Sequence, residues 1–179
     1  MVSKYAFDTS GDFNSIRSRG TVFGGVGKAN GAEVVTDDFF TACNKISQGG
    51  IRRGSFAAYL DIESEDFDEA IGNLKKKGNG RNYGWTIRDT FIEKLKNDDP
   101  EANRRFQEAL YVKLTTGKGY LFFPDKANRH RPQMYKDLGL DIKATNLCTE
   151  ILLHSSEKLT FSCILSSLNL VHWDKIKHS

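Results

Sequence analysis

Cysteine is scarce in this sequence, and the few cysteines show none of the spacings that hold small folds together. Of 179 residues only three are cysteine, at Cys43, Cys148 and Cys163, and no two form a Cys-x-x-Cys pair. An odd number without paired spacing argues against a disulfide framework and against a zinc site. The four histidines also lack metal-ligand spacing, so no metal site is expected. Such cysteine usage suits a reducing compartment, and we expect a cytoplasmic protein.

The sequence also lacks the features of membrane proteins and nucleic-acid-binding proteins. Its net charge is only +3, and no apolar run is long enough to span a bilayer. The first residues do not form a basic segment followed by an apolar one, so we expect no signal peptide. With 39% hydrophobic and 27% charged residues, the composition is that of an ordinary soluble domain. We therefore expect no membrane partner and no nucleic-acid partner, and a basic nucleic-acid-binding domain is the weakest functional hypothesis.

Apolar residues recur with periods that predict alternating helices and strands. Helices are expected at residues 37–46, 66–77, 89–95 and 100–114, and strands at residues 54–62, 82–87 and 119–123. This alternation is typical of an α/β fold with parallel strands. The length allows one domain with a core. We nevertheless expect that the sheet does not close by itself, because the first 35 residues offer little apolar surface.

The sequence also predicts where these elements begin and which side chains they bury. Asp37 is expected to cap the first helix, and the helix at 66–77 is expected to face the core with four side chains: Phe67, Ala70, Ile71 and Leu74. Residues 1–35 are predicted to be loop with at most one short strand, and residues 124–145 to be irregular. The remaining strands are predicted at residues 146–153, 159–163 and 165–170.

The most informative segment is NLCTEI, residues 146–151. On an extended strand, Asn146, Cys148 and Glu150 would project to one face. An amide, a thiol and a carboxylate on one face can form a reaction centre. A lone cysteine on a strand is more often a small buried hydrophobe, but a neighbouring amide and carboxylate are costly to bury without partners. A second cysteine, Cys163, follows on another predicted strand, and together with Cys148 it suggests thiol redox chemistry. Without Cys148, packing in a core would be the preferred interpretation of Cys163.

Two loops rich in glycine and arginine predict phosphate or nucleotide binding. One spans residues 47–55 and contains Gln48, Gly49, Gly50, Arg52 and Arg53. The other spans residues 17–28 and contains Arg17 and Arg19. Glycines let backbone N–H groups approach a phosphate, and arginines add bidentate donors. Each loop alone is a weak signal, because such loops are common turns.

Taken together, these segments resemble the large, catalytic subunit of ribonucleotide reductase. The resemblance includes TGKGY at 116–120, NLCTEI at 146–151, CILSSLNL at 163–170, SQGGIRRG at 47–54, AAYLDI at 57–62 and SIRSRG at 15–20. It extends over nearly the whole chain, in the same order and with fitting spacing. It implies that the α/β fold is part of the family's ten-stranded barrel, incomplete in this chain. Residues 1–35 would be effector-loop-like, residues 47–55 specificity-loop-like, and residues 146–170 the finger loop and the following redox-cysteine strand, within one partial domain over 1–179.

The same resemblance implies a role for each candidate residue. Cys148 would be the thiyl-radical residue that takes the 3′ hydrogen of the ribose. Glu150 would be the general base on the 3′ hydroxyl, and Asn146 would hold the sugar. Cys163 would be one of two thiols that reduce the 2′ carbon and end as a disulfide. The effector, a deoxynucleoside triphosphate or ATP, would bind near Arg17 and Arg19.

The resemblance also implies partners that this chain does not itself contain. No cofactor would bind directly, because the radical would come from a small subunit of the diiron type, in preference to cobalamin. The substrate would be a ribonucleotide, and thioredoxin or glutaredoxin would be the reductant. The second redox cysteine, the loop for the substrate phosphates, the radical-path tyrosines and the C-terminal thiol pair of the family have no counterpart here, and Cys43 does not stand where the missing redox cysteine should.

Two hypotheses follow from this mixture of matching and missing parts. The first is a catalytic-core fragment that reduces ribonucleoside diphosphates or triphosphates when completed by complementary chains of the large subunit. The second is a non-catalytic nucleotide-binding or interaction remnant of the reductase. Because a piece of a barrel leaves sheet edges unpaired, we expect marginal stability without the complement.

Overall fold

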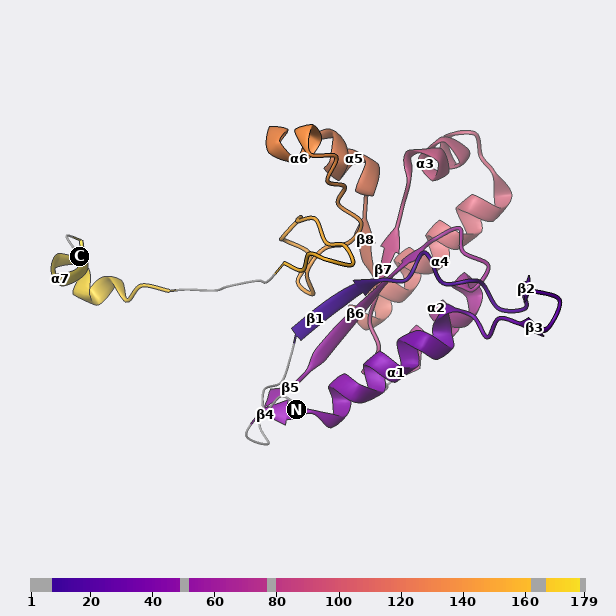
Figure 1. Cartoon of the computed structure of the whole chain (residues 1–179), viewed down its shortest axis with the longest axis horizontal. Coiled ribbons are helices and arrows are strands. Elements are labelled where there is room, and N and C mark those ends of the chain that lie inside the picture. The colour runs from indigo at the N-terminus through magenta and orange to yellow at the C-terminus, as the bar shows by residue number, and fades with distance from the viewer. Residues whose placement is uncertain (1–7, 49–51, 77–79, 162–166, 178–179) are drawn as a thin grey trace.

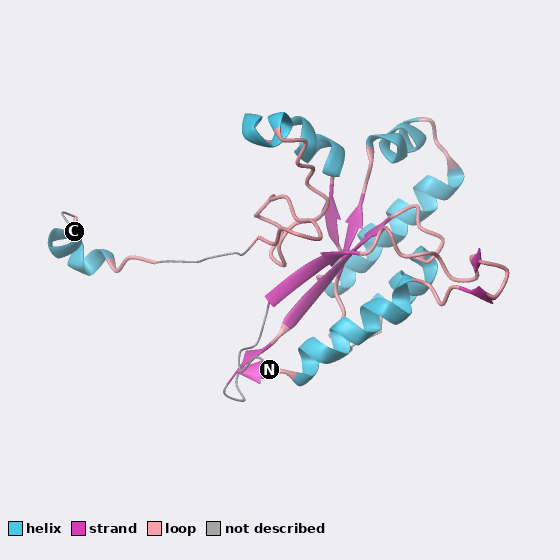
Figure 2. Ribbon diagram, in the orientation of Figure 1, coloured by secondary structure: helices cyan, strands magenta, loops and turns pink. Residues whose placement is uncertain are grey.

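The centre of the molecule is a four-stranded parallel sheet. The computed structural model describes residues 8–48, 52–76, 80–161 and 167–177. The strand order is β1-β6-β7-β8, and all three pairings are parallel (Figure 2). The strands are β1 (Asp8–Asp12), β6 (Ser55–Asp61), β7 (Tyr83–Thr86) and β8 (Tyr120–Phe122). The predicted α/β fold with parallel strands is therefore confirmed.

Helices follow the strands and cover one face of this sheet. They are α1 (Ala32–Lys45), α2 (Phe67–Leu74), α3 (Asp89–Lys96) and α4 (Pro100–Thr116). Helix α4 has Pro at its first turn, and the side chain of Asp99 caps it by accepting the N–H of Ala102 at 2.8 Å. Two short helices, α5 (Pro124–Arg129) and α6 (Gln133–Asp137), come after β8. No helix in the described ranges combines the length and apolarity needed to cross a membrane.

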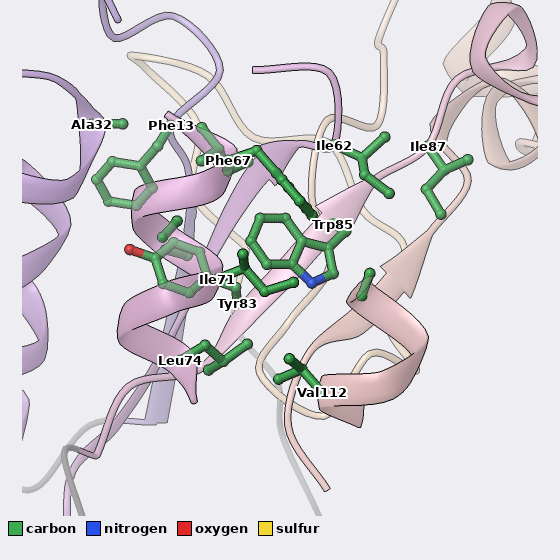
Figure 3. Close-up of a cluster of buried hydrophobic side chains, with 14 of the residues drawn as sticks. Phe13, Ala32, Ile62, Phe67, Ile71, Leu74, Tyr83, Trp85, Ile87 and Val112 are labelled. Atoms are coloured by element: carbon green, nitrogen blue, oxygen red, sulfur yellow. The ribbon is translucent and has the colours of Figure 1, made fainter. Parts of the chain in front are cut away.

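The main core lies between the sheet and these helices. Figure 3 shows Trp85 of β7 surrounded by side chains of α2 and by Val112 of α4. The ring centroids of Trp85 and Phe67 are 4.8 Å apart. All four side chains predicted to face the core from this helix are buried: Phe67, Ala70, Ile71 and Leu74. The helical period of these residues was therefore a correct guide to burial.

Strand β6 is buried on both faces, as expected of an inner parallel strand. Phe56, Ala58 and Leu60 belong to the main core, whereas Ala57 and Tyr59 belong to a second cluster on the opposite face. That second cluster is covered by the segment that contains Ile142. In Figure 1 this orange segment lies on the other side of the sheet from α1 and α2.

A buried polar network attaches α1 to the sheet. Glu33 is almost fully buried, forms an ion pair with Arg81 and accepts hydrogen bonds from Tyr83 and from Asn73, the latter at 2.7 Å. Tyr83 also shares a 2.8 Å hydrogen bond with the hydroxyl of Thr36. Because a buried carboxylate needs partners, this network fixes how α1 sits on the sheet.

Three predictions about the first part of the chain and the region after β8 need correction. Helix α1 begins at Ala32, so the predicted start at Asp37 is wrong. Residues 1–35 contain β1 and also a small hairpin of β2 (Val22–Phe23) and β3 (Gly27–Lys28). Residues 124–145 are not wholly irregular, because they contain α5 and α6. Short helices of five or six residues leave too few turns to show a period.

The sheet is open in the part of the chain that the structure describes. Strands β1 and β8 each have a neighbour on one edge only. At the C-terminal end, η1 (Leu170–His172) and α7 (Trp173–Ile176) lie apart from the sheet in Figure 1. Leu170, Val171 and Trp173 are largely exposed there. The fold therefore presents unpaired strand edges together with uncovered apolar side chains.

Candidate active site

The segment that carries Asn146, Cys148 and Glu150 is a turn, so the predicted strand over 146–153 is wrong. The backbone N–H of Thr149 donates to the carbonyl of Asn146 at 3.1 Å, and Thr149 has a φ of 67°. A β-branched residue rarely adopts this left-handed conformation. The chain reverses here, so alternate residues cannot share one face.

Asn146 explains why this segment turns. Its side-chain oxygen accepts the N–H groups of Glu150 at 3.2 Å and of Ile151 at 3.0 Å. Its side-chain nitrogen donates to the Glu150 carboxylate at 2.9 Å. Such side-chain hydrogen bonds offer the backbone an alternative to a sheet. The amide and the carboxylate are therefore brought together as expected, but across a turn, with Cys148 exposed between them.

The segment before the turn fixes it to the sheet. Ser10 of β1 donates a hydrogen bond to the carbonyl of Thr145, and the hydroxyls of Tyr59 and Thr145 are hydrogen-bonded. Burial raises the pKa of Tyr59 to about 12. Leu147 packs against the second apolar cluster. The turn is thus held by two neighbouring strands.

A cavity of about 420 Å³ adjoins the turn, with Thr145 and Thr149 in its wall. Most of its lining is apolar and includes Phe122, Phe123 and Leu152. Such a pocket could hold the apolar parts of a ligand or of a partner beside the turn.

Cys163 lies outside the described residues, as do Gly49 and Gly50. Residues 159–161 and 167–169, at the edges of the other two predicted strands, are not in strands. No group of three or more His, Cys, Asp or Glu side chains in the described ranges is arranged to hold a metal ion.

The first glycine- and arginine-rich loop is closed at its base by Asp66. The Asp66 carboxylate accepts the N–H of Arg19 and the N–H of Ala32, each at 2.8 Å. The Arg19 guanidinium makes two 2.7 Å hydrogen bonds to Glu69 of α2. These bonds and the charge of Glu69 raise the pKa of Arg19. Arg19 thus already has an anionic partner within the chain.

Arg17 is placed differently, beside a cavity of about 490 Å³ at the start of α1. Its exposed guanidinium lies 5.4 Å from the ring centre of Phe23. Asn30, Gly31 and Ser15 also line this cavity. A guanidinium, backbone groups and small polar side chains that line one cavity are suited to an anionic ligand.

The second such loop lies at the other end of α1. Its strands are β4 (Ser47–Gln48) and β5 (Arg52–Arg53), which form an antiparallel pair. Helix α1 has 14 residues and so separates the two loops by about 21 Å at 1.5 Å per residue. Figure 1 shows β2 and β3 near one end of α1 and β4 and β5 near the other. The two loops therefore lie at opposite ends of α1.

Four residues that position these sites were missed in the sequence: Tyr59, Asp66, Gly84 and Thr145. Gly84 lies against Tyr59, because a Cβ atom at position 84 would be 2.2 Å from a ring carbon of that tyrosine. Only Gly84 carried a signal, because a glycine inside a buried strand often marks a close approach of another group. The other three act through contacts with residues distant in sequence, which no local pattern reveals.

Comparison with known proteins finds one consistent relationship. The family model described as ribonucleotide reductase, barrel domain, matches residues 2–102 and 99–178. The ribonucleoside-diphosphate reductase large subunit of Invertebrate iridescent virus 3 is 36% identical over 210 residues, covering 75% of this chain and 33% of that protein. The subunit alpha of Chlamydia trachomatis is 27% identical over 223 residues, covering 96% of this chain and 21% of that protein.

A solved structure is also similar. It is the Actinobacillus ureae class Id ribonucleotide reductase alpha subunit, with a TM-score of 0.78 and 38% identity. The match covers 94% of this chain and 31% of that one. The chain thus spans between about a fifth and a third of the length of these relatives.

Proposed function

Because this chain belongs to the ribonucleotide reductase barrel-domain family, we propose that it reduces ribonucleotides once the rest of the barrel is present. The observation that supports this most is the turn in which Asn146 binds the Glu150 carboxylate while Cys148, which lies between them in the sequence, is exposed. The open sheet is accordingly a part of the family's α/β barrel.

In this proposal each residue of the turn has one task. A thiyl radical on Cys148 takes the 3′ hydrogen of the ribose, which leaves the radical on that carbon. Glu150 accepts the proton of the 3′ hydroxyl, a thiol of the redox pair gives a proton to the 2′ hydroxyl, which departs as water, and Asn146 orients the carboxylate and the sugar. Cys163 and the second thiol of this pair also deliver the remaining proton and two electrons to the 2′ carbon and become a disulfide. Cys148 then returns its hydrogen to the 3′ carbon.

The structure also supports a site for the missing part of the barrel. The unpaired edges of β1 and β8 can accept further strands. The apolar cavity beside β8, with Phe123 and Leu152 partly exposed, adjoins one of these edges. Closing the barrel would cover the turn and exclude water from the radical. We therefore propose complementary large-subunit chains as partners.

The remaining partners are proposed from the family. A radical-generating small subunit of the diiron type would oxidise Cys148, and thioredoxin or glutaredoxin would reduce the disulfide. A deoxynucleoside triphosphate or ATP would bind in the cavity beside Arg17 as an effector. The loop at 47–55 would relay which effector is bound to the substrate base.

Reconstitution tests the proposed activity. The 179-residue chain is mixed with chains that carry the remaining strands, a small subunit and a thiol reductant, and deoxyribonucleotide formation is measured. We expect Cys148→Ala to abolish activity and Cys43→Ala, a matched control remote from the turn, to retain it. Retained activity in Cys148→Ala would refute the radical assignment. No activity in any combination, with effector binding preserved, would favour the non-catalytic nucleotide-binding remnant.

A further inference from the structure

Tyr59 occupies an unusual place for a core tyrosine, because its ring is fully buried and its hydroxyl points to the active-site turn. It lies on β6, on the face of the sheet opposite α1–α4, and its hydroxyl contacts the hydroxyl of Thr145. Its ring packs edge-on against Phe122, with centroids 5.7 Å apart. The phenol therefore connects the rigid middle of the sheet to the residue that precedes Asn146.

The direction of the hydrogen bonds follows from the donors available. The Thr145 hydroxyl donates to the carbonyl of Asn146 at 2.9 Å. A hydroxyl has only one hydrogen, so Tyr59 must be the donor to Thr145. The same Asn146 carbonyl accepts the N–H of Thr149 at 3.1 Å. A continuous chain thus runs from the phenol through Thr145 to the carbonyl that closes the turn.

Gly84 on the neighbouring strand makes this arrangement possible. A Cβ atom at position 84 would lie 2.2 Å from a ring carbon of Tyr59, which no real side chain tolerates. The absence of a side chain lets the Tyr59 ring lie across β7. The position of the phenol is therefore specified by two strands together.

We propose that Tyr59, with Gly84 beneath it and Thr145 as the link, is the positioning residue that sets the active-site turn. This inference rests on the proposed function for its catalytic consequence but not for its structural content. Tyr59 acts through Thr145 and Asn146, so its effect is on where Cys148 and Glu150 stand. An error of about 1 Å in such a placement can cost about a hundredfold in rate.

Hydrogen exchange in the full 179-residue chain tests the structural part. Tyr59→Phe keeps the ring and removes the hydroxyl. We expect exchange of the Thr149, Glu150 and Ile151 amides, which all donate to Asn146, to rise at least tenfold. The amides of Ala58 and Ile87, which donate to the carbonyls of Asn82 and Phe122, should stay protected. Tyr83→Phe is the matched control, because it removes an equally buried hydroxyl from the opposite face of the same sheet.

A second pair of variants tests the same link if Tyr59→Phe fails to fold. Thr145→Val, which lacks the hydroxyl, should loosen the same three amides, and Thr145→Ser, which keeps it, should restore their protection. In the reconstituted reductase, Tyr59→Phe should lower kcat at least tenfold with little change in KM. Unchanged exchange of the three amides in both Tyr59→Phe and Thr145→Val would overturn the inference. An equal loss of protection at amides throughout the sheet would overturn it as well. If Tyr59→Phe speeds exchange of these three amides but the reconstituted reductase is inactive even with the unsubstituted chain, the proposed function is overturned and the structural inference stands.

Discussion

The carboxylate of Asp66 caps helix α1 by accepting the backbone N–H of Ala32 at 2.8 Å, although 34 positions separate the two residues. The same carboxylate holds Arg19, so it closes both ends of the loop between them. Asp66 is only 3% exposed, and its carboxylate holds the loop and the start of α1 in place through these two N–H groups.

Removing this cap should weaken the fold. Asp66→Ala leaves two N–H groups without their acceptor, and we expect the free energy of unfolding to fall by about 2–4 kcal/mol. Asp66→Asn keeps one carbonyl oxygen and should cost less. Urea denaturation measures the change, with Asp38→Ala, an exposed acid on α1, as a control expected within about 0.5 kcal/mol. Equal stability of Asp66→Ala and the parent would contradict the capping role.

Two buried tyrosines should make the protein sensitive to alkali. Burial raises the pKa of Tyr59 and of Tyr83 to about 12 each, above the usual value of 10. A raised pKa means that the neutral phenol is favoured in the folded state. This stability is fully present below pH 10 and is lost as pH rises through 12, on the order of 2 kcal/mol for each tyrosine. Urea midpoints measured from pH 9 to 12 should fall, and the Tyr59→Phe, Tyr83→Phe double variant should flatten the curve. A fall of the same size in the double variant would assign the effect to other groups.

Replacing the left-handed residue Thr149 of the turn by glycine should stabilise the chain. Thr149 has a φ of 67°, a conformation that glycine adopts without strain. We expect Thr149→Gly to stabilise the chain by up to about 1 kcal/mol, because relief of strain exceeds the added freedom of the unfolded chain. Thermal unfolding monitored by circular dichroism checks the sign. Thr160→Gly, outside the turn, serves as a control, and destabilisation by both substitutions would mean that Thr149 is not strained.

Effector binding should depend more on Arg17 than on Arg19. Arg17 lines the cavity at the start of α1, whereas Arg19 is engaged with Glu69. Titration calorimetry with a deoxynucleoside triphosphate should show at least a tenfold loss of affinity in Arg17→Ala. Arg19→Ala should show a smaller loss together with a lower unfolding temperature. An unaltered affinity in Arg17→Ala would remove this cavity as the effector site.

Local sequence patterns predicted the elements whose secondary structure is determined by their own residues. The helical period of α2 and the apolar run of β6 were visible because burial repeats along each element. The start of α1 was not visible, because its cap comes from Asp66 across the fold. The active-site turn was mistaken for a strand because Asn146 satisfies its backbone through a side chain. Asn146 and Glu150 still met, since the turn joins residues four apart as effectively as a strand face does.

Tyr59 and Gly84 should be energetically coupled. Gly84→Ala places a methyl group against the Tyr59 ring, and we expect a loss of about 1–3 kcal/mol, as is usual for overpacking. In a Tyr59→Leu background, which lacks the ring, the same change should cost less. A double-mutant cycle of unfolding free energies measures the coupling. Simple additivity of the two substitutions would mean that the strands shift to relieve the contact.

Because Gly84 lies so close to the ring of Tyr59, substitutions at the two positions should depend on each other during evolution. A larger residue at 84 is less costly once a smaller one has appeared at 59, but a smaller residue at 59 removes the phenol that holds the turn. Relatives of this chain should therefore vary at the two sites together or at neither. An alignment deep enough to show covariation would reveal this pair even where overall identity is low.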